Sequence, residues 1–143
     1  MKKYVLNIEG APNWNADRRA AFSHLGLSLR KKRLFDSLEV GDRIITYVKS
    51  TGFVDVREIA VRGTTKLGLQ GNYPEGAWPW QIKTHLVATT GLENAISPNN
   101  FSQTKLCSGQ WRYRFQQSGT LVDPADGEII ASAIIVAAKR LQQ

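Results

Sequence analysis

Four large aromatic residues fall where a strand is expected to end or a loop to begin: Trp14, Tyr47, Trp78 and Trp80. Aromatic faces in such places can stack on unpaired nucleobases, and one stack is worth roughly 1–3 kcal/mol. The alternative is that each ring belongs to the core or its rim, because large aromatic side chains are highly buried on average. Trp78 and Trp80 flank Pro79, a spacing that favours two rings at a pocket mouth. We assign Trp111 and Tyr113 to the core.

The densest positive charge in the chain is a run of four adjacent cations: Arg30, Lys31, Lys32 and Arg33. Such a run can contact successive phosphates of a nucleic acid and release their counterions. A solvated helix face is the alternative, and it is at least as common for a short basic run. Arg18 and Arg19, which precede the run, are candidates to extend the same phosphate-binding patch.

The overall charge points to the same class of partner. The formal net charge is +7, and the sequence pI is about 9.8. Residues 1–72 carry 13 Lys and Arg against 7 Asp and Glu, whereas residues 73–143 carry 6 against 5. Charge of this kind attracts polyanions, of which nucleic acid is the densest in a cell, although a generically basic protein is the alternative.

Length and composition are those of one folded domain, residues 1–143, and we expect it to be a monomer. The single cysteine, Cys107, allows no internal disulfide. The residues after Met1 are typical of an opening strand and not of a signal peptide. No apolar run approaches the ~20 residues that a membrane-spanning helix needs. We therefore expect a protein of the cytoplasm, or of the nucleus in a eukaryote, with no membrane partner.

Signatures of catalysis or metal binding are poor. His24 and His85 lie far apart and, with Cys107, give no metal-ligand spacing. No nucleophile elbow, phosphate-binding loop or paired-carboxylate motif is present. We expect no catalytic residue, no metal and no cofactor. Two alternatives stay open: a small hydrolase or nuclease acting on nucleic acid or nucleotides, using Asp55 or Glu58, and a protein-interaction module whose aromatic residues mark a partner surface.

Hydrophobic periodicity predicts a strand, then helices, then four or five strands and a final helix. A short helix is expected over residues 16–22, capped by Asn15, and a second short helix or an irregular stretch is expected over residues 27–38. Strands are expected over residues 4–8, 43–49, 53–61, 78–89 and 111–115. The alternation shifts near Arg57 in the third of these strands, which indicates either a bulge or a strand buried on both faces.

Two of these elements carry more detailed expectations. In strand 43–49, Ile44, Thr46 and Val48 share one face, Ile45, Tyr47 and Lys49 share the other, and only one set is expected in the core. Asp123 and Pro124 open the last helix as cap and first residue. Its buried stripe is predicted to be Ile129, Ile130, Ala133, Ile134, Ala137 and Leu141.

Three segments taken together resemble a known family: the opening strand 4–8, the segment 38–50 with its Gly41-Asp42 turn, and the strand end 58–61. They are similar to the EVE domain, a branch of the PUA-like superfamily that also holds the YTH and ASCH domains. The resemblance covers nearly the whole chain. It implies an α+β fold, in which a small curved β-barrel of mostly antiparallel or mixed strands carries flanking helices and a C-terminal helix.

The resemblance also implies a function and a site. It implies a module that recognises a flipped, modified base of DNA or RNA in a pocket at one end of the barrel. Carried over by position, the ends of the first strand and of the Gly-Asp strand would line this pocket: Asn7, Ile8, Glu9, Tyr47, Lys49 and Ser50. Trp14, Trp78 and Trp80 would be candidates for its aromatic walls.

Overall fold

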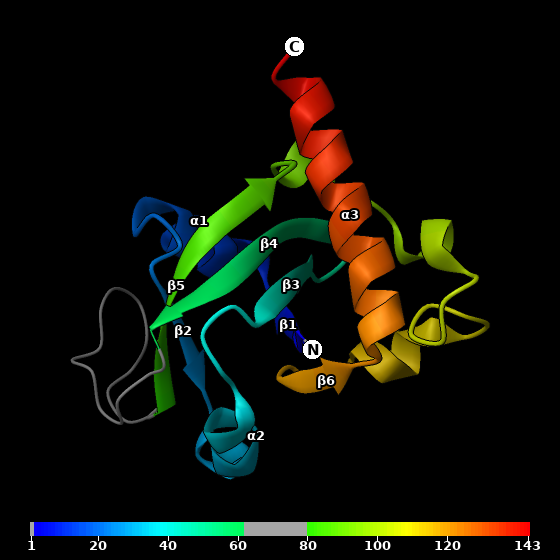
Figure 1. Ribbon diagram of the computed structural model, residues 1–143. Helices are drawn as coiled ribbons and strands as arrows, with labels where there is room; N and C mark the ends of the chain where they lie inside the picture. Colours follow the sequence, from blue (N-terminus) through cyan, green and yellow to red (C-terminus); the bar gives the residue numbers. More distant parts are fainter. Residues whose placement is uncertain (1, 62–79) are drawn as a thin grey trace.

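The computed structural model describes residues 2–61 and 80–143. Its centre is one six-stranded sheet with the strand order β2–β5–β4–β3–β1–β6 (Figure 1). The strands are β1 (Tyr4–Glu9), β2 (His24–Leu27), β3 (Arg43–Val48), β4 (Gly52–Val61), β5 (Trp80–Thr89) and β6 (Thr120–Val122). The helices are α1 (Ala11–Arg19), α2 (Lys32–Ser37) and α3 (Pro124–Leu141). Four 3₁₀ turns complete the described part: η1 (Leu29–Lys31), η2 (Leu92–Asn94), η3 (Pro98–Phe101) and η4 (Trp111–Phe115).

The sheet is mixed and curled, which confirms the predicted α+β class with flanking helices and a C-terminal helix. β1 pairs in parallel with β3, from Tyr4 opposite Arg43 to Glu9 opposite Val48, and the other strand pairs are antiparallel. A parallel pair needs a long crossover, which the chain supplies with α1, β2 and α2. Parallel pairing also places the carboxyl ends of β1 and β3 side by side at one end of the sheet, where a pocket was predicted.

Both faces of the sheet are buried. Tyr4, Leu6 and Ile45 point to the face that packs on α3, whereas Val5 and Ile44 point to the face that packs on Phe35 of α2. Figure 1 shows α3 lying across the sheet, whereas α1 and α2 lie away from α3, α1 towards the upper left and α2 at the bottom of the view. The expectation that only one face of β3 lies in the core is therefore wrong: the relative exposure of Ile44 and of Ile45 is 0%.

The crossover differs from its prediction in detail. α1 begins at Ala11, after Gly10, and not at Asn15, because Pro12 suits the first helical turn. It ends before Ala21 and Phe22, whose φ angles of 56° and 53° are incompatible with a continuing helix. The stretch 27–38 contains the end of β2, the turn η1 and the short helix α2.

The segment 111–115 is a 3₁₀ turn and not the predicted strand. In a strand Trp111, Tyr113 and Phe115 would share one face, whereas one helical turn directs the middle residue away from the other two. Trp111 and Phe115 are each 7% exposed, which confirms the core assignment of Trp111. The same assignment is wrong for Tyr113, which is 61% exposed.

The end of the chain follows its prediction more closely. Asp123 caps α3, because its Oδ1 accepts a hydrogen bond from the backbone N–H of Ala125 at 3.0 Å. Pro124 is the first helical residue, and Lys139 and Arg140 lie in the last turn, where the helix dipole favours cations. The buried face of α3 differs from the predicted one, because Ile129 and Leu141, which were predicted to be buried, are exposed. The buried apolar side chains of α3 are Ile130, Ala131, Ile134 and Ala138.

Gly127 allows α3 to approach the first strand closely. A Cβ atom at this position would lie 2.3 Å from Cγ of the Tyr4 ring. Alanine normally stabilises a helix by about 0.5–1 kcal/mol relative to glycine. We predict that Gly127→Ala instead destabilises the protein by about 1–3 kcal/mol, as overpacking does.

Urea unfolding measures this effect. Ser132→Ala, on the exposed side of the same helix, is the control and should stay within about 0.5 kcal/mol of the parent. A Gly127→Ala variant as stable as the parent would contradict the close approach of α3 to Tyr4.

Candidate nucleic-acid interface

A hollow of about 610 Å³ opens beside the end of β3, and we call it the aromatic hollow. Three buried rings contribute to its lining: Tyr47, Trp111 and Phe115. The ring centroids of Tyr47 and Phe115 are 4.7 Å apart, and those of Trp111 and Phe115 are 5.2 Å apart, both in edge-to-face geometry. Such packing fixes the orientation of the rings. The volume is typical of a site for a small ligand.

The rest of this lining is polar or cationic. Of the residues predicted from the sequence, Tyr47, Lys49 and Ser50 all line the hollow. Ser50 has a φ of 61°, a left-handed conformation that is uncommon outside glycine and that clusters at functional sites. Thr51 directly follows Ser50, and the remaining lining residues come from elsewhere in the chain: Ser97, Pro98, Asn99, Arg112 and Gln116.

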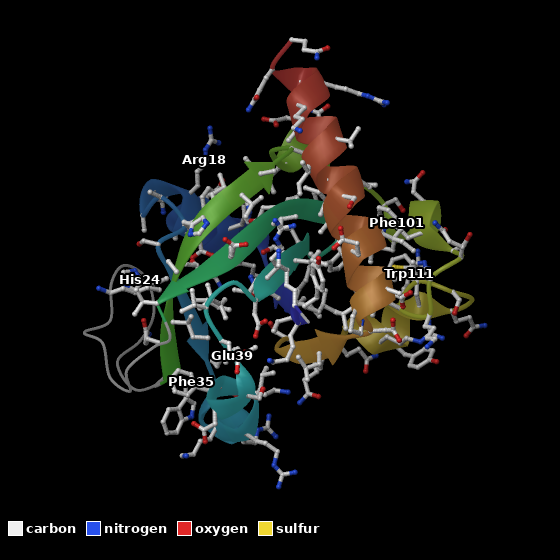
Figure 2. All side chains as sticks on the ribbon, viewed as in Figure 1. Arg18, His24, Phe35, Glu39, Phe101 and Trp111 are labelled. Carbon is white, nitrogen blue, oxygen red and sulfur yellow. The ribbon has the colours of Figure 1, made fainter. Side chains whose placement is uncertain are left out.

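The 3₁₀ turn η4 holds two of these polar groups in place. Trp111 Nε1 donates a hydrogen bond to Asn99 Oδ1 at 2.8 Å. The guanidinium of Arg112 lies 4.7 Å from the centroid of the Trp111 ring, in cation–π geometry. Trp111 therefore orients both an amide and a cation at the rim. Figure 2 shows Trp111 beside α3, on the side of the molecule that also carries Phe101.

A second, smaller hollow of about 230 Å³ adjoins the first, and we call it the basic hollow. Gln116 lines both hollows and therefore lies at their junction. The charged side chains in the two linings are all basic: Lys49 and Arg112 in the aromatic hollow, and Arg30 and Lys31 in the basic hollow. The other residues of the basic hollow are Gly26, Leu27, Ser28, Gln117 and Ser118.

The predicted cationic run is divided by the structure. Arg30 and Lys31 lie in η1, at the basic hollow. Lys32 and Arg33 begin α2, where Lys32 Nζ forms an exposed ion pair with Asp36 Oδ2 at 2.8 Å. We therefore expect Arg30 and Lys31 to contribute more to phosphate binding than Lys32.

The expected extension of this patch by Arg18 and Arg19 is not formed. Both residues are exposed in the last turn of α1. Figure 1 places α1 and α2 well apart, and Figure 2 shows Arg18 at the α1 end, far from Trp111.

The buried end of β1 is hydrogen-bonded to a residue that lines the basic hollow. Asn7, Ile8 and Glu9 are each less than 10% exposed. The backbone N–H of Ile8 donates to Ser118 Oγ at 2.8 Å, and Ser118 Oγ donates to Asn7 Oδ1 at 3.4 Å. Because Ser118 lines the basic hollow, it connects this lining to the end of β1.

A buried charge network lies beneath α1, and nothing in the sequence indicated it. Arg57, at 0% exposure, is its centre. Arg57 Nη2 contacts Glu9 Oε1 at 2.8 Å and Asp55 Oδ2 at 3.1 Å, and Nη1 contacts Asp17 Oδ2 at 3.1 Å. The guanidinium also lies 5.0 Å from the centroid of the Phe22 ring. Glu9 and Asp17 are 48 and 40 residues away from Arg57 in the sequence.

One guanidinium cannot neutralise three carboxylates, and the network compensates by holding a proton. Burial raises the pKa of Glu9, Arg57 opposes this in part, and Asp17 and Asp55 add to it, so that the pKa is about 8. Burial alone would lower the pKa of Arg57, but the surrounding carboxylates outweigh it and raise that pKa. At neutral pH Glu9 is therefore mostly a neutral acid.

Two of the three predicted tryptophan walls, Trp14 and Trp80, lie outside the lining of the aromatic hollow. Trp14 is 1% exposed, and its Nε1 donates to Asp55 Oδ2 at 2.9 Å, so its ring is enclosed by protein and serves the charge network. Trp80 is half-buried against Phe35 of α2, with ring centroids 5.4 Å apart. Trp78 lies outside the described residues. Trp111 supplies the tryptophan of the aromatic hollow, although the sequence indicated only that it belongs to the core.

Within residues 2–61 and 80–143, no three or more His, Cys, Asp or Glu side chains are grouped so that they could hold a metal ion. In the same ranges no helix combines the length and the apolar character needed to cross a membrane.

Comparison with known proteins identifies the fold. No protein-family model matches the sequence, and no curated protein sequence matches it. Solved structures do match, and the fold is that of YTH domains, within the PUA-like α+β class. The Mmi1 YTH domain in complex with RNA is 12% identical with a TM-score of 0.72, over 97% of this chain and 81% of that chain.

Two other structures agree. The Toxoplasma CPSF4 YTH domain in complex with a 7-mer m6A-modified RNA is 14% identical with a TM-score of 0.68, over 94% of this chain and 91% of that one. A hypothetical protein from Leishmania major is 12% identical with a TM-score of 0.64, over 100% and 98% of the two chains. At these identities the likeness establishes the fold.

The buried acid predicts a particular dependence of stability on pH. Between pH 4.5, the usual pKa of a glutamate, and about pH 8, Glu9 is ionised in the unfolded chain and protonated in the folded one. The folded state then binds more protons, so this group makes the free energy of unfolding fall as the pH rises through that window. Glu9→Gln keeps a neutral hydrogen-bonding group and abolishes the titration.

We therefore expect Glu9→Gln to become more stable relative to the parent as the pH rises from 5 to 8.5. Denaturant unfolding at several pH values measures the difference. Asp36→Asn, at an exposed carboxylate, should show no comparable trend. A difference in stability between Glu9→Gln and the parent that stays constant from pH 5 to 8.5 would show that Glu9 is ionised in the folded protein.

Proposed function

We propose that this chain is a nucleic-acid-binding module that takes up a flipped, modified base in the aromatic hollow. The observation that carries the proposal is the position of this hollow directly beside the basic hollow, with Gln116 shared by both. A flipped base needs an aromatic or apolar surface for its ring and polar groups for its edge. The phosphates on either side of it need cations. The two hollows offer these features next to each other.

The residues divide into three roles. Tyr47, Trp111 and Phe115 would contact the ring of the base. The polar side chains of Ser50 and Asn99 would face its hydrogen-bonding edge. The cations at the two hollows would bind the phosphates: Lys49, Arg112, Arg30 and Lys31. The fold supports this assignment, because two of the similar structures are complexes with RNA and one of those RNAs is m6A-modified.

We also propose that the chain binds its ligand without chemical reaction and belongs to the EVE branch of the PUA-like superfamily. The segment around the Gly41-Asp42 turn supports the EVE assignment. For binding over catalysis, the support is that the buried side chains of Glu9, Asp17 and Asp55 are already engaged in contacts with Arg57.

Titration with matched oligonucleotides tests the function. The ligands are single-stranded RNAs whose central adenine is unmodified or N6-methylated, and single-stranded DNAs with the same flanking sequence that carry in its place a cytosine, unmodified or 5-methylated. We expect measurable affinity for one backbone and tighter binding of one modified form. Equal affinity for all modified and unmodified pairs would contradict recognition of a modified base, and no binding at low salt would contradict the whole proposal.

Phosphate binding at the basic hollow predicts a change in salt dependence. We expect the double variant Arg30→Ala with Lys31→Ala to bind more weakly, and to lower the slope of log K against log salt by about one unit for each phosphate that is no longer neutralised. The matched control replaces Lys139 and Arg140, two exposed cations at the end of α3. If both double variants show the same slope, the effect is one of net charge, and Arg30 and Lys31 bind no phosphate directly.

The junction of the two hollows gives a second test. Gln116→Glu places a negative charge where both linings meet, and we expect it to lower affinity about ten-fold, or about 1.4 kcal/mol, because phosphates are repelled there. Gln142→Glu adds the same charge at an exposed residue at the end of α3, outside both linings, and should have a much smaller effect. Equal losses of affinity in the two variants would place the nucleic acid elsewhere.

A further inference from the structure

Tyr113 is the one exposed aromatic side chain in residues 2–61 and 80–143. It is 61% exposed, while the flanking aromatic residues of the same turn, Trp111 and Phe115, are each 7% exposed. So large a ring contributes little to the core in this position. Its exposure is therefore a feature that neither the stability of the fold nor the aromatic hollow explains.

The Tyr113 ring is held in place by a neighbouring cation. The guanidinium of Arg114 lies 4.9 Å from the centroid of the Tyr113 ring. Arg114 Nη1 in turn donates hydrogen bonds to the backbone carbonyls of Leu106 at 3.1 Å and Ser108 at 2.7 Å. Because Arg114 is anchored, the ring that stacks on it loses little further freedom when it binds a ligand. An exposed ring that is already ordered is suited to stacking.

Tyr113 also lies close to the aromatic hollow. Arg112, the residue before it, lines the hollow, and Trp111 and Phe115 on the same turn supply two of its rings. Adjacent Cα atoms are about 3.8 Å apart. The turn that carries the exposed ring therefore also forms part of the rim of the hollow.

The surroundings favour a nucleic acid over a protein partner. Tyr113 stands between the cations Arg112 and Arg114, and the exposed side chains nearby in the sequence are the amides of Gln110, Gln116 and Gln117. A protein interface generally has a core that is more apolar than the rest of the surface. A single ring among cations and amides matches instead the combination of stacking and positive charge found in single-strand binding sites.

We propose that Tyr113 is a second stacking site, which holds the base of a nucleotide adjacent to the one in the aromatic hollow. This inference rests on the proposed function and adds a requirement for the ligand: the strand must carry an unpaired base beside the modified one. Stacking tolerates any base, because every base has a π-face. The site should therefore add affinity without adding selectivity for the modification.

The test combines variants of Tyr113 with oligonucleotides that lack one neighbouring base. The ligands are the preferred modified oligonucleotide and versions with an abasic residue directly 5′ or 3′ of the modified one, so that the phosphates are unchanged. We expect Tyr113→Ala to lose about ten-fold in affinity for the intact ligand and Tyr113→Phe to lose almost none. With one of the two abasic ligands, parent and Tyr113→Ala should bind equally.

The controls separate this inference from the proposed function. Leu121→Ala, at another exposed apolar side chain, should bind as the parent does, and melting temperatures should confirm that all variants are folded. If the parent binds the modified ligand and Tyr113→Ala binds it equally well, the second stacking site is wrong and the base-binding function stands. A loss of affinity that is the same for intact and both abasic ligands would also overturn it. If the parent itself fails to bind, both proposals fail.

Discussion

Arg57 and its carboxylate partners form the interaction on which the arrangement of this protein depends. A buried cation is costly unless it is paired and hydrogen-bonded, and removal of one partner of such a group typically costs about 3–5 kcal/mol. Here the partners come from three elements: Glu9 from β1, Asp17 from α1 and Asp55 from β4 itself. The network therefore fixes where α1 sits against the sheet, and Trp14 is locked in the same place by its bond to Asp55.

The bulge in β4 makes this network possible. Thr46 of β3 lies opposite Asp55, but the next residue, Tyr47, lies opposite Phe53, so Val54 is the additional residue of β4. A bulge of this kind changes which face the following side chains occupy. Asp55 and Arg57 thus reach the α1 side, while Phe53 packs against Tyr47 on the other side, with ring centroids 5.7 Å apart. The same irregularity therefore supports the charge network and the aromatic rings beside the candidate site.

The sequence predicts features that depend on neighbouring residues and misses those that depend on distant ones. Gly41 (φ 94°) and the cap Asp123 follow from local backbone requirements, and both were predicted. The alternation of 111–115 indicates a strand, yet η4 forms because Trp111 and Phe115 pack against Tyr47 from β3. In the same way, the family resemblance placed Tyr47, Lys49 and Ser50 at a pocket, whereas Asn99, Arg112 and Gln116 join them only through folding. The partners of Arg57 had no local signal at all.

The distribution of charge between interior and surface links the fold to the proposed function. The chain contains 19 Lys and Arg and 12 Asp and Glu. Five acidic side chains are buried, at positions 9, 17, 42, 55 and 126, whereas Arg57 is the only buried cation in the described ranges. Because negative charge is concentrated inside, the surface is more positive than the net charge of +7 indicates. A polyanion that approaches the protein meets the cations directly, while the acids that would repel it are shielded or, for Glu9, largely protonated.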